Sequence, residues 1–407
     1  MAIATGDTCI SGADERRPPL IRGVTRMAVH TLLDRLSRPR PRQFDDVPHR
    51  IEAITSEWLS ETLGTACGAP PVKDFQIERL TSGTSVRCRI RLDYEDHDHA
   101  VANGGAPETI FVKSSPGFLN RVMLGITRTI ENEGLFYRHI RELLDIEAPI
   151  AYHTAFDIRT GRSAHLLEDI EASKGAIFCT PAMHIDRRQA EDIVTTLARF
   201  HSRFLGQADL VTRFPWLKAY PQWFADGYEA FGLKRFHDQA MKEAEAVIPE
   251  RLRECADDLW EAKIRSLDAH RRMPQTLLHG DVHLGNWYVT ETRAMGLCDW
   301  QCVTIGCWAR DLAYALVACL TIEDRRDWER DLLRLYLEEL AAQTGSTISF
   351  DEAWLLYRQQ AISALMMWTV TLVHSPLMPD MQPRETAIEM IRRASTAMVD
   401  LEALECL

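Results

Sequence analysis

The chain has 407 residues, of which 46% are hydrophobic and 26% charged, and its net charge is −12. This length is enough for two to three structural units. The acidic balance argues against a nucleic-acid partner, because binding a phosphate backbone needs concentrated Lys and Arg.

The ten cysteines are scattered, without a C-x-x-C pair or a metal-like spacing. They therefore indicate reduced thiols in a cytoplasmic protein. The first residues do not show a basic stretch followed by an apolar run, so we expect no signal peptide. The most apolar long stretch, residues 361–373, is too short to span a bilayer and predicts a buried helix without membrane insertion.

Residues 1–50 are expected to form an N-terminal extension that is partly flexible. They show little periodicity and contain Pro18-Pro19 and Pro39-Arg40-Pro41. Residues 24–36 can form a short helix. We interpret the basic stretch 35–42 as a solvated linker.

Residues 51–170 predict a β-rich lobe. The segment 55–59 is typical of a capped helix start, and a turn at 81–85 separates two hairpin strands. The loop 95–108 contains Asp96-His97-Asp98-His99, which could bind a metal but which we interpret as a solvated tip. The expected strands are 75–80, 86–94 and 109–113, followed by a helix over 131–144 and two further strands that end at 165–170.

Residues 171–407 predict a mainly helical lobe. Helices are expected over 187–204, 239–269, 327–342 and 351–373, and a last one runs through Met398. A β-rich first part followed by a helical second part is an α+β layout in two lobes.

The most informative motif is the segment 279–286, His-Gly-Asp-Val-His-Leu-Gly-Asn, followed by a hairpin and Asp299. If Thr290 pairs with Met295 across the turn, antiparallel register sets Asn286 opposite Asp299. Two hard oxygen donors side by side suit Mg²⁺. Asp281, on the loop just before, is close enough to accept a proton from a substrate hydroxyl.

A second pair of residues in the first lobe supplies a cation near this site. Glu133 lies on the apolar stripe of the helix 131–144, and a carboxylate on a buried face needs a cationic partner. Lys113, at the end of the strand 109–113, is the candidate. A Lys held by a Glu is a way to position an ammonium for binding phosphate.

Two other nucleotide contacts follow from weaker patterns. Gly83, Thr84 and Ser85 offer amides and hydroxyls that could cover phosphates, although the segment has no G-x-G-x-x-G and could be an ordinary hairpin turn. The strand that ends near Glu168 runs into a predicted hinge. There, the carbonyl of Glu168 and the amide of Ile170 could pair with an adenine edge, or this could be a strand end with solvated acids.

The segment 279–286, Asp299-Trp300-Gln301 and Arg310-Asp311-Leu312-Ala313-Tyr314 resemble the aminoglycoside phosphotransferase and ecdysteroid-kinase-like group, which has the protein-kinase-like fold. The similarity covers about residues 51–400. It implies an enzyme that uses ATP and Mg²⁺. Asp299-Trp300-Gln301 departs from the D-F-G of protein kinases, which fits the small-molecule branch. The resemblance implies Asp281 as catalytic base, Asn286 and Asp299 as metal ligands, Lys113 and Glu133 as the phosphate-binding pair, 168–170 as hinge, and His279 and Asp311 as supports of the catalytic loop.

The acceptor is expected to be a hydrophobic alcohol, such as a steroid-like metabolite. Aminoglycosides are polycations that need carboxylates, whereas the segments 214–231 and 353–373 are rich in aromatic and Met side chains, with no acid in the second. An aminoglycoside phosphotransferase is the alternative. A regulatory pseudokinase that binds nucleotide without turnover is a third reading, which the intact set of charged residues disfavours.

Overall fold

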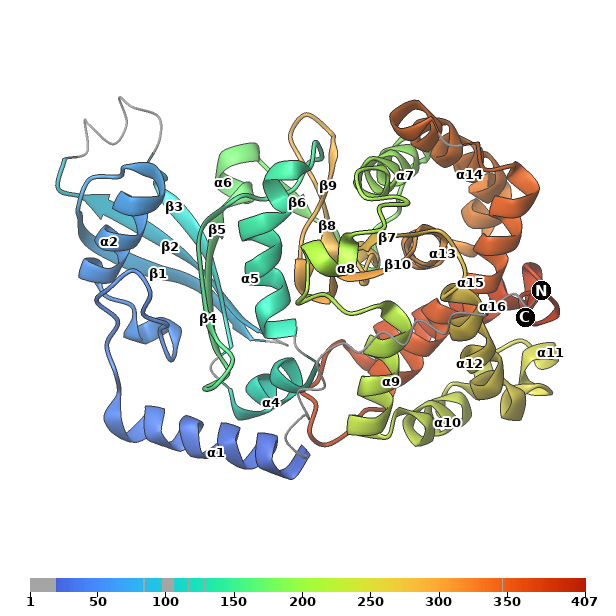
Figure 1. Ribbon diagram of the computed structural model, residues 1–407, viewed down its shortest axis with the longest axis horizontal. Helices are drawn as coiled ribbons and strands as arrows, with labels where there is room; N and C mark the ends of the chain where they lie inside the picture. The colour runs from blue at the N-terminus through green and yellow to red at the C-terminus, as the bar shows by residue number, and fades with distance from the viewer. Residues whose placement is uncertain (1–19, 83–84, 97–105, 116, 128, 346) are drawn as a thin grey trace, which may run out of the picture.

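The computed structural model describes residues 20–82, 85–96, 106–115, 117–127, 129–345 and 347–407. A β-sheet lobe and a mainly helical lobe lie side by side (Figure 1). The expected α+β fold with two lobes is therefore confirmed.

The sheet of the first lobe has five antiparallel strands in the order β1-β2-β3-β5-β4. Side chains on β2 alternate in burial: Cys88, Ile90 and Leu92 are buried against helix α2, so Arg87 and Arg89 emerge on the opposite face. That face is turned toward helix α5 and the second lobe (Figure 1). The elements are β1 (Val72–Ser82), β2 (Val86–Tyr94), β3 (Thr109–Ser114), β4 (Ala151–Asp157), β5 (Arg162–Glu168), α2 (Ser56–Cys67) and α5 (Thr129–His139).

Helices in the first lobe differ from the prediction in number and length. The start of α2 is as expected, because the side chain of Thr55 accepts a hydrogen bond from the amide of Trp58. Helix α5 ends at His139 and is followed by a 3₁₀ turn, so the predicted helix over 131–144 is too long. Helix α1 (Leu20–Ser37) is longer than the short helix considered possible at 24–36. Helix α4 (Phe118–Thr127), on which α1 packs, was not predicted.

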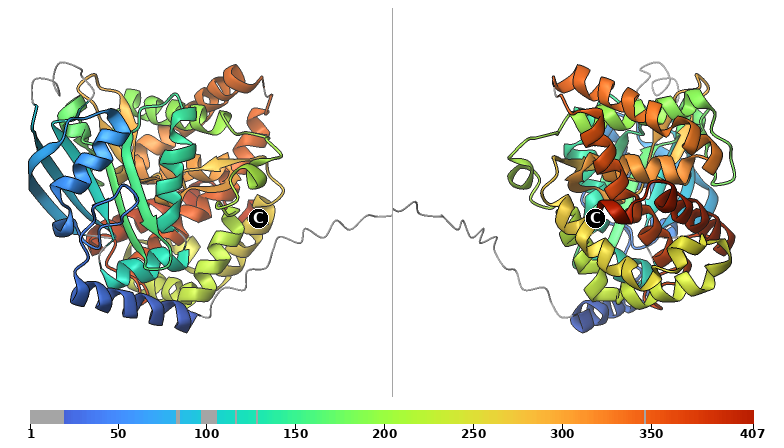
Figure 2. Two further views of the ribbon diagram at one scale, coloured as in Figure 1. Left: turned by 60° about the vertical axis from the view of Figure 1, so that its left-hand side comes forward. Right: turned by 90° about the vertical axis from the view of Figure 1, so that its right-hand side faces the viewer.

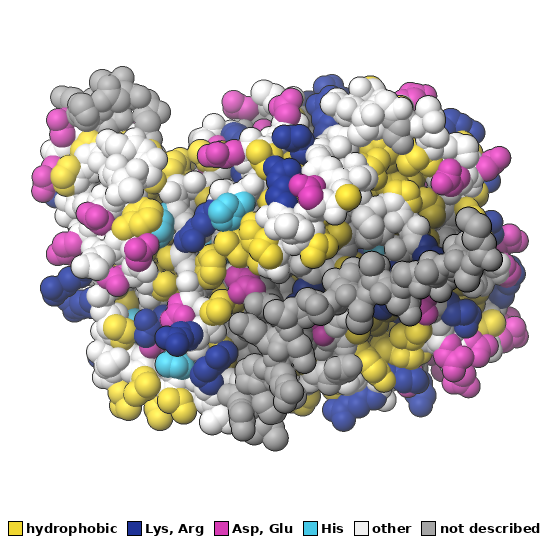
Figure 3. Space-filling view, in the orientation of Figure 1, with side chains coloured by type: hydrophobic (Ala, Val, Ile, Leu, Met, Phe, Trp, Pro, Cys, Tyr) yellow, Lys and Arg dark blue, Asp and Glu magenta, His cyan; other side chains and the backbone are white. Residues whose placement is uncertain are grey.

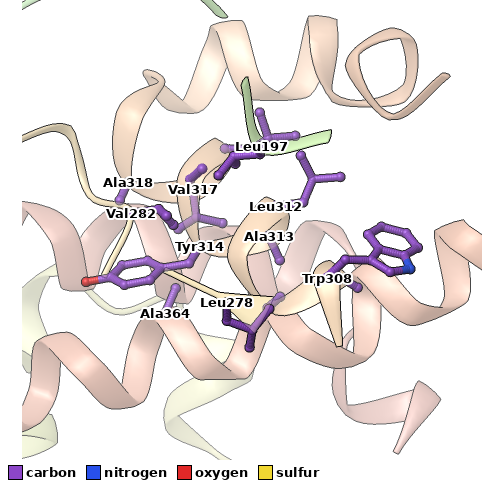
Figure 4. Close-up of a cluster of buried hydrophobic side chains, with 14 of the residues drawn as sticks. Leu197, Leu278, Val282, Trp308, Leu312, Ala313, Tyr314, Val317, Ala318 and Ala364 are labelled. Atoms are coloured by element: carbon purple, nitrogen blue, oxygen red, sulfur yellow. The ribbon is translucent and has the colours of Figure 1, made fainter. Parts of the chain in front are cut away.

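The second lobe is built around helix α13 (Trp308–Cys319), in which every residue is buried. Ten of its twelve residues are uncharged and mainly apolar, which is typical of an interior helix, and its two charged residues, Arg310 and Asp311, form an ion pair. Figure 4 shows side chains of α13, among them Leu312 and Tyr314, packed against Leu197, Leu278 and Ala364 from three other segments. The surrounding helices are α7 (Arg187–Ser202), α14 (Ile322–Thr344), α15 (Phe350–Leu372) and α16 (Arg384–Asp400), with α9 (Tyr220–Phe231), α10 (Leu233–Glu243) and α12 (Leu259–His270) at one side.

One predicted helix of this lobe is wrong. The segment 239–269 is not continuous but breaks between α10 and α12, where Pro249 stands among short turns and the four-residue helix α11 (Glu250–Arg253). A proline lacks the amide hydrogen that a helix interior requires. The short elements are α6 (Ile170–Lys174), α8 (Leu210–Arg213), β6 (Ile177–Phe178), β7 (Gln275–Leu278), β8 (Trp287–Val289), β9 (Met295–Leu297) and β10 (Thr304–Cys307).

Among the described residues, the nine cysteines are free thiols and no group of acids, His and Cys could hold a metal by itself. The described part of the chain also contains no helix long and apolar enough to cross a membrane. Residues 97–99 of the predicted loop tip lie outside the described residues.

Candidate active site

The predicted register of the β8–β9 hairpin is wrong by one residue. Val289 pairs with Met295, and the amide of Cys298 donates to the carbonyl of Asn286, so Asn286 lies opposite Cys298 instead of Asp299. The cause is the turn, because the hydroxyl of Thr290 accepts from the amide of Ala294 and thereby draws both residues into the loop. The two proposed metal ligands nevertheless border the same cavities.

Asp299 reaches this place through its backbone conformation. Its φ is +66°, in the left-handed region that side-chain-bearing residues rarely adopt. Just past the end of β9, this conformation redirects the chain into a 3₁₀ turn. The carboxylate of Asp299 contacts two cations of the first lobe: Lys113 Nζ at 2.7 Å from Oδ1, and Arg87 at 3.2 Å from Oδ2.

The expected ion pair of the first lobe is present, since Lys113 Nζ lies 2.8 Å from Glu133 Oε2 and both side chains are buried. Lys113 therefore bridges two carboxylates. Burial alone would lower the pKa of Lys113, but the charges of Asp299 and Glu133 raise it above its ordinary value. Burial raises the pKa of Glu133. For Asp299 the neighbouring Lys113 and Arg87 outweigh burial and lower the pKa. The two carboxylates thus favour the charged form of Lys113.

Helix α5, which carries Glu133, is also fixed to the segment after Asp299. The ring of Trp300 stacks on Phe136 of α5 with centroids 4.0 Å apart and planes 6° from parallel. The amide of Asn132 donates to the carbonyl of Val303 at 3.1 Å. These contacts hold the two lobes in the arrangement in which Lys113, Glu133 and Asp299 meet.

Asp281 lies on the loop between β7 and β8, and two neighbours orient its carboxylate. The side-chain amide of Asn286 donates to the Asp281 carbonyl at 2.7 Å and to Oδ2 at 3.2 Å. The hydroxyl of Tyr314, on the central helix α13, donates to Oδ1 at 3.2 Å. Asp281 therefore stands at the mouth of the helical lobe with both oxygens directed by fixed donors.

The same loop is braced from below by Asp311 and His279. Asp311, fully buried, accepts the amide hydrogens of His279 and Gly280, at 2.6 and 3.2 Å. The ring of His279 accepts from the amide of Asp281 and bonds the carbonyl of Cys298 at 3.0 Å. Gly280 has φ +86°, and a Cβ there would lie 2.2 Å from the carbonyl oxygen of Cys302. Only glycine fits this position.

The smaller of two cavities at the lobe interface, about 110 Å³, is rich in charge. Asp169 and Glu171 form its far side and are paired with Arg89 of β2. Glu168 ends β5, Ile170 begins α6, and both border the cavity, while their contact with adenine stays a prediction. Six of the predicted residues line this cavity: Lys113, Glu133, Glu168, Ile170, Asn286 and Asp299.

The larger cavity, about 470 Å³, lies between α4, α9, α15 and the Asp281 loop. Its size falls within the range of roughly 300–1,000 Å³ that is typical of small-molecule sites. Arg87, Asp281 and Asp299 are its only ionic side chains among the described lining residues. The rest of the lining is mainly aromatic and aliphatic: Met123, Leu124, Trp223, Phe224, Phe231, Leu233, Tyr314, Met366, Met367, Trp368, Val370, Met378 and Met381.

The structure describes only part of the segment 83–85 that was predicted to cover phosphates. Gly83 and Thr84 lie outside the described residues. Ser85 is buried, accepts from Arg87 Nε at 3.3 Å, and borders the larger cavity instead of the smaller one.

Three site residues were missed by the sequence reasoning: Arg87, Tyr314 and His283. Arg87 alternates with buried residues on β2, which was a usable signal. Tyr314 stands three residues after Asp311 on one helix, and therefore on the same face. His283, inside the motif, accepts from the Gly285 amide through Nδ1, which leaves Nε2 as the donor, 3.7 Å from Asp281 Oδ2.

The chain is similar to known proteins in sequence and in fold. The family model described as "Phosphotransferase enzyme family" matches residues 104–353. None of the curated proteins compared with the chain matches its sequence. A solved structure of choline kinase from Cryptosporidium parvum Iowa II is 12% identical, with a TM-score of 0.50, and the match covers 82% of this chain and 91% of that one.

Two further solved structures are similar to this fold. Ethanolamine kinase from Plasmodium vivax is 11% identical, with a TM-score of 0.47, over 92% of this chain and 94% of that one. Macrolide 2′-phosphotransferase from Brachybacterium faecium is 16% identical, with a TM-score of 0.43, over 83% and 97%. At these identities the likeness concerns the fold alone.

Proposed function

This chain belongs to the phosphotransferase enzyme family and is a small-molecule kinase, and we propose that it transfers the γ-phosphoryl group of ATP to the hydroxyl of a hydrophobic alcohol. The observation that carries the proposal is that Asn286 and Asp299 border both a charged cavity and a largely apolar one, while Asp281 lines the apolar one beside them. We assign residues 51–170 to nucleotide binding and 171–407 to catalysis and the acceptor.

The charged cavity is the proposed nucleotide site. Lys113, held by Glu133, would contact the phosphates, and the backbone of Glu168 to Ile170 would contact the adenine. At about 110 Å³ the cavity is small for ATP. Lys113, Arg87 and Arg89 are engaged with carboxylates across it, so binding would exchange these ion pairs for pairs with phosphate.

Asn286 and Asp299 fit a hard divalent cation. Both oxygens of the buried Asp299 carboxylate contact cations, Arg87 and Lys113, so the surroundings of this carboxylate favour positive charge. The amide nitrogen of Asn286 is turned to Asp281, which leaves its oxygen for the cavity. Mg²⁺, when bound there, would neutralise charge on the phosphates. Asp281 would orient the acceptor hydroxyl and accept its proton.

The lining of the larger cavity supports the acceptor class. Among the described residues that line it, the acids are Asp281 and Asp299, both of which already have roles in the proposed chemistry. A polycationic antibiotic would lack carboxylates to pair with its remaining ammonium groups. A lipophilic alcohol would instead bury its surface on Trp223, Phe224 and Trp368.

The test is a competition among acceptor classes. The protein is incubated with ATP and Mg²⁺ and with lipophilic alcohols, choline and aminoglycosides, and phosphorylated products are identified by mass spectrometry. We expect products from the lipophilic alcohols that are absent with Asp281→Asn. Preferential phosphorylation of choline or of an aminoglycoside would contradict the acceptor class, and nucleotide binding without any product would favour a pseudokinase.

A further inference from the structure

Helix α1 has two opposite faces, and only one of them is used by the described fold. Met27, Thr31 and Asp34 are buried at 3, 7 and 3% exposure. Met27 packs against Gly125 of α4, and Asp34 forms ion pairs with Arg121 and Arg162. These residues recur every three to four positions and define the docked face.

The other face of α1 is apolar and open to solvent. Val29, Leu32, Leu33 and Leu36 are 49, 57, 49 and 72% exposed. At about 100° per residue they point away from the docked face. Figure 3 shows hydrophobic side chains gathered at the lower left, over the C-terminal half of α1. The helix lies at the outer edge of the molecule in the views of Figures 1 and 2.

Positive charge accompanies this apolar stripe. Residues 20–50 contain seven arginines and three aspartates, in a chain whose net charge is −12. Arg35, Arg38, Arg40 and Arg42 are exposed at and just after the end of α1. Asp34, the only acid of α1, is buried in its ion pairs and does not offset them.

We propose that α1 and residues 38–42 form an interfacial anchor that binds the surface of an anionic lipid bilayer, with Val29, Leu32, Leu33 and Leu36 entering the headgroup region. A helix with an apolar stripe and flanking arginines has the chemistry of such anchors. The anchor lies on the surface and does not span the membrane.

The charges favour this occupant over a second copy of the chain. A two-fold contact between two α1 helices would bring Arg26 and Arg35 of one copy near the same arginines of the other, with no exposed acid on α1 to offset them. An anionic surface satisfies both the leucines and the arginines. Helix α4, which holds α1, also lines the larger cavity through Met123, Leu124 and Thr127. With the proposed function, the anchor would also bring the acceptor cavity close to a source of lipophilic alcohols. Only this last consequence rests on the proposed function.

The experiment is co-sedimentation of the full chain with vesicles of phosphatidylcholine alone or with added phosphatidylserine. We expect binding to the anionic vesicles that weakens with added salt. Leu32→Glu/Leu36→Glu should reduce the partition coefficient by about 100-fold. Arg35→Gln/Arg40→Gln/Arg42→Gln should do so to a similar extent, since each arginine near such a surface contributes about fivefold.

The matched control places the same charges elsewhere. Val211→Glu/Ile264→Glu changes two exposed apolar residues of α8 and α12, 64 and 42% exposed, and should bind vesicles like the unmodified chain. Circular dichroism and thermal unfolding check that each variant is folded. The arginine variant tests the proposal independently if the leucine variant does not fold.

Several results would overturn the proposal. One is that the full chain does not bind anionic vesicles, or that the leucine variant binds them equally well. Another is a dimer that the leucine variant dissociates without any vesicle binding, which would assign the face to a second copy. Vesicle binding only after removal of residues 1–19 would show that this segment covers the face. None of these readouts depends on phosphoryl transfer.

Discussion

The two cavities share a wall, formed by Arg87, Asn286 and Asp299, yet their other lining residues are of different kinds. Eight of the 17 residues that line the smaller cavity are charged, compared with three of the 26 that line the larger one. In the first, cations and carboxylates of β2, β3, α5 and the hinge neutralise one another. In the second, rings and thioethers from α4, α9 and α15 face each other.

This difference distinguishes the residues that phosphoryl transfer requires from the residues that binding of the acceptor requires. Phosphoryl transfer requires charge compensation for phosphate, which restricts the residues of this side to cations, carboxylates and other metal-binding groups. The acceptor side requires only a shape and a polarity, which many combinations of side chains provide. Exchange of Glu133, Asp281 or Asp299 should therefore cost far more activity than a substitution among the apolar side chains of the larger cavity.

The largest effect is expected for Asp281→Asn. This variant keeps the hydrogen bond from Tyr314 but loses the proton acceptor. Turnover should fall by about 10²–10⁴-fold with ATP–Mg²⁺ affinity nearly unchanged. Asp299→Asn should lose metal-dependent nucleotide binding as well. Calorimetric titration beside turnover separates them, and the reverse pattern would mean that base and metal ligand have been exchanged.

A smaller effect is expected for Glu133→Gln, which tests whether Lys113 needs its buried partner. The variant keeps the size of the side chain but leaves Lys113 with Asp299 alone. We expect kcat/KM for ATP to fall by about 10- to 100-fold, by analogy with the loss of a partner that orients a metal-binding residue. Glu142→Gln, on the 3₁₀ turn after α5, is a control of equal charge change. Full activity of Glu133→Gln would make the ion pair a structural feature only.

Most of the charged side could be predicted from the sequence because its signals are local. The segment 279–286 and Asp299 stand within 21 positions of each other, and Glu133 was found from helical periodicity. The residue-level register could not be predicted, since it depends on how the turn is closed, by the backbone bond from the Thr290 amide to the Ala294 carbonyl and by the bond that the Thr290 hydroxyl accepts from the Ala294 amide. Asn286 and Asp299 still border one cavity because Asp299 adopts a left-handed backbone that alternation rules do not foresee.

For the apolar side, only the amino-acid composition of the segments that line it could be predicted. The aromatic and Met content of 214–231 and 353–373 was visible, and Trp223, Phe224 and Trp368 do line the cavity. Tyr220 and Tyr357, from the same segments, are fully buried core residues instead. Helix α4 was not predicted, so the residues that it contributes to the lining of the larger cavity were missing from the prediction. Helical periodicity marks a buried face without saying whether it meets another helix or a ligand.

A change on the apolar side should act through the acceptor alone. Met367→Glu places a carboxylate in the larger cavity at a partly buried position of α15. The KM for a lipophilic alcohol should rise by about tenfold while the KM for ATP stays the same, since a single pocket contact is worth about 10- to 200-fold. Leu355→Glu, exposed at 43% on the outer side of the same helix, is the control. Equal KM values in both variants would mean that the acceptor binds elsewhere.

The smallest effect concerns two buried histidines, His165 of β5 and His237 of α10, whose pKa is lowered by burial. Burial and the nearby Lys113 lower the pKa of His165 to about 3. Burial lowers the pKa of His237, which bonds Thr369, to about 4. In the unfolded chain both titrate near 6.5, so below this pH the unfolded state binds more protons than the folded one. The free energy of unfolding should therefore fall as the pH drops from about 6.5 to 4, by up to about 1.4 kcal/mol per pH unit for each histidine.

His237→Asn can separate this contribution from the rest of the acid sensitivity. Asparagine can still bond Thr369, so the variant should fold, but it takes up no proton and should reduce the slope of unfolding free energy against pH between 4 and 6.5. Urea unfolding at a series of pH values compares the variant with the unmodified chain. An unchanged slope in His237→Asn would mean that this histidine is protonated in the folded state. The interior of the helical lobe would then contain a charged side chain, as the nucleotide site does.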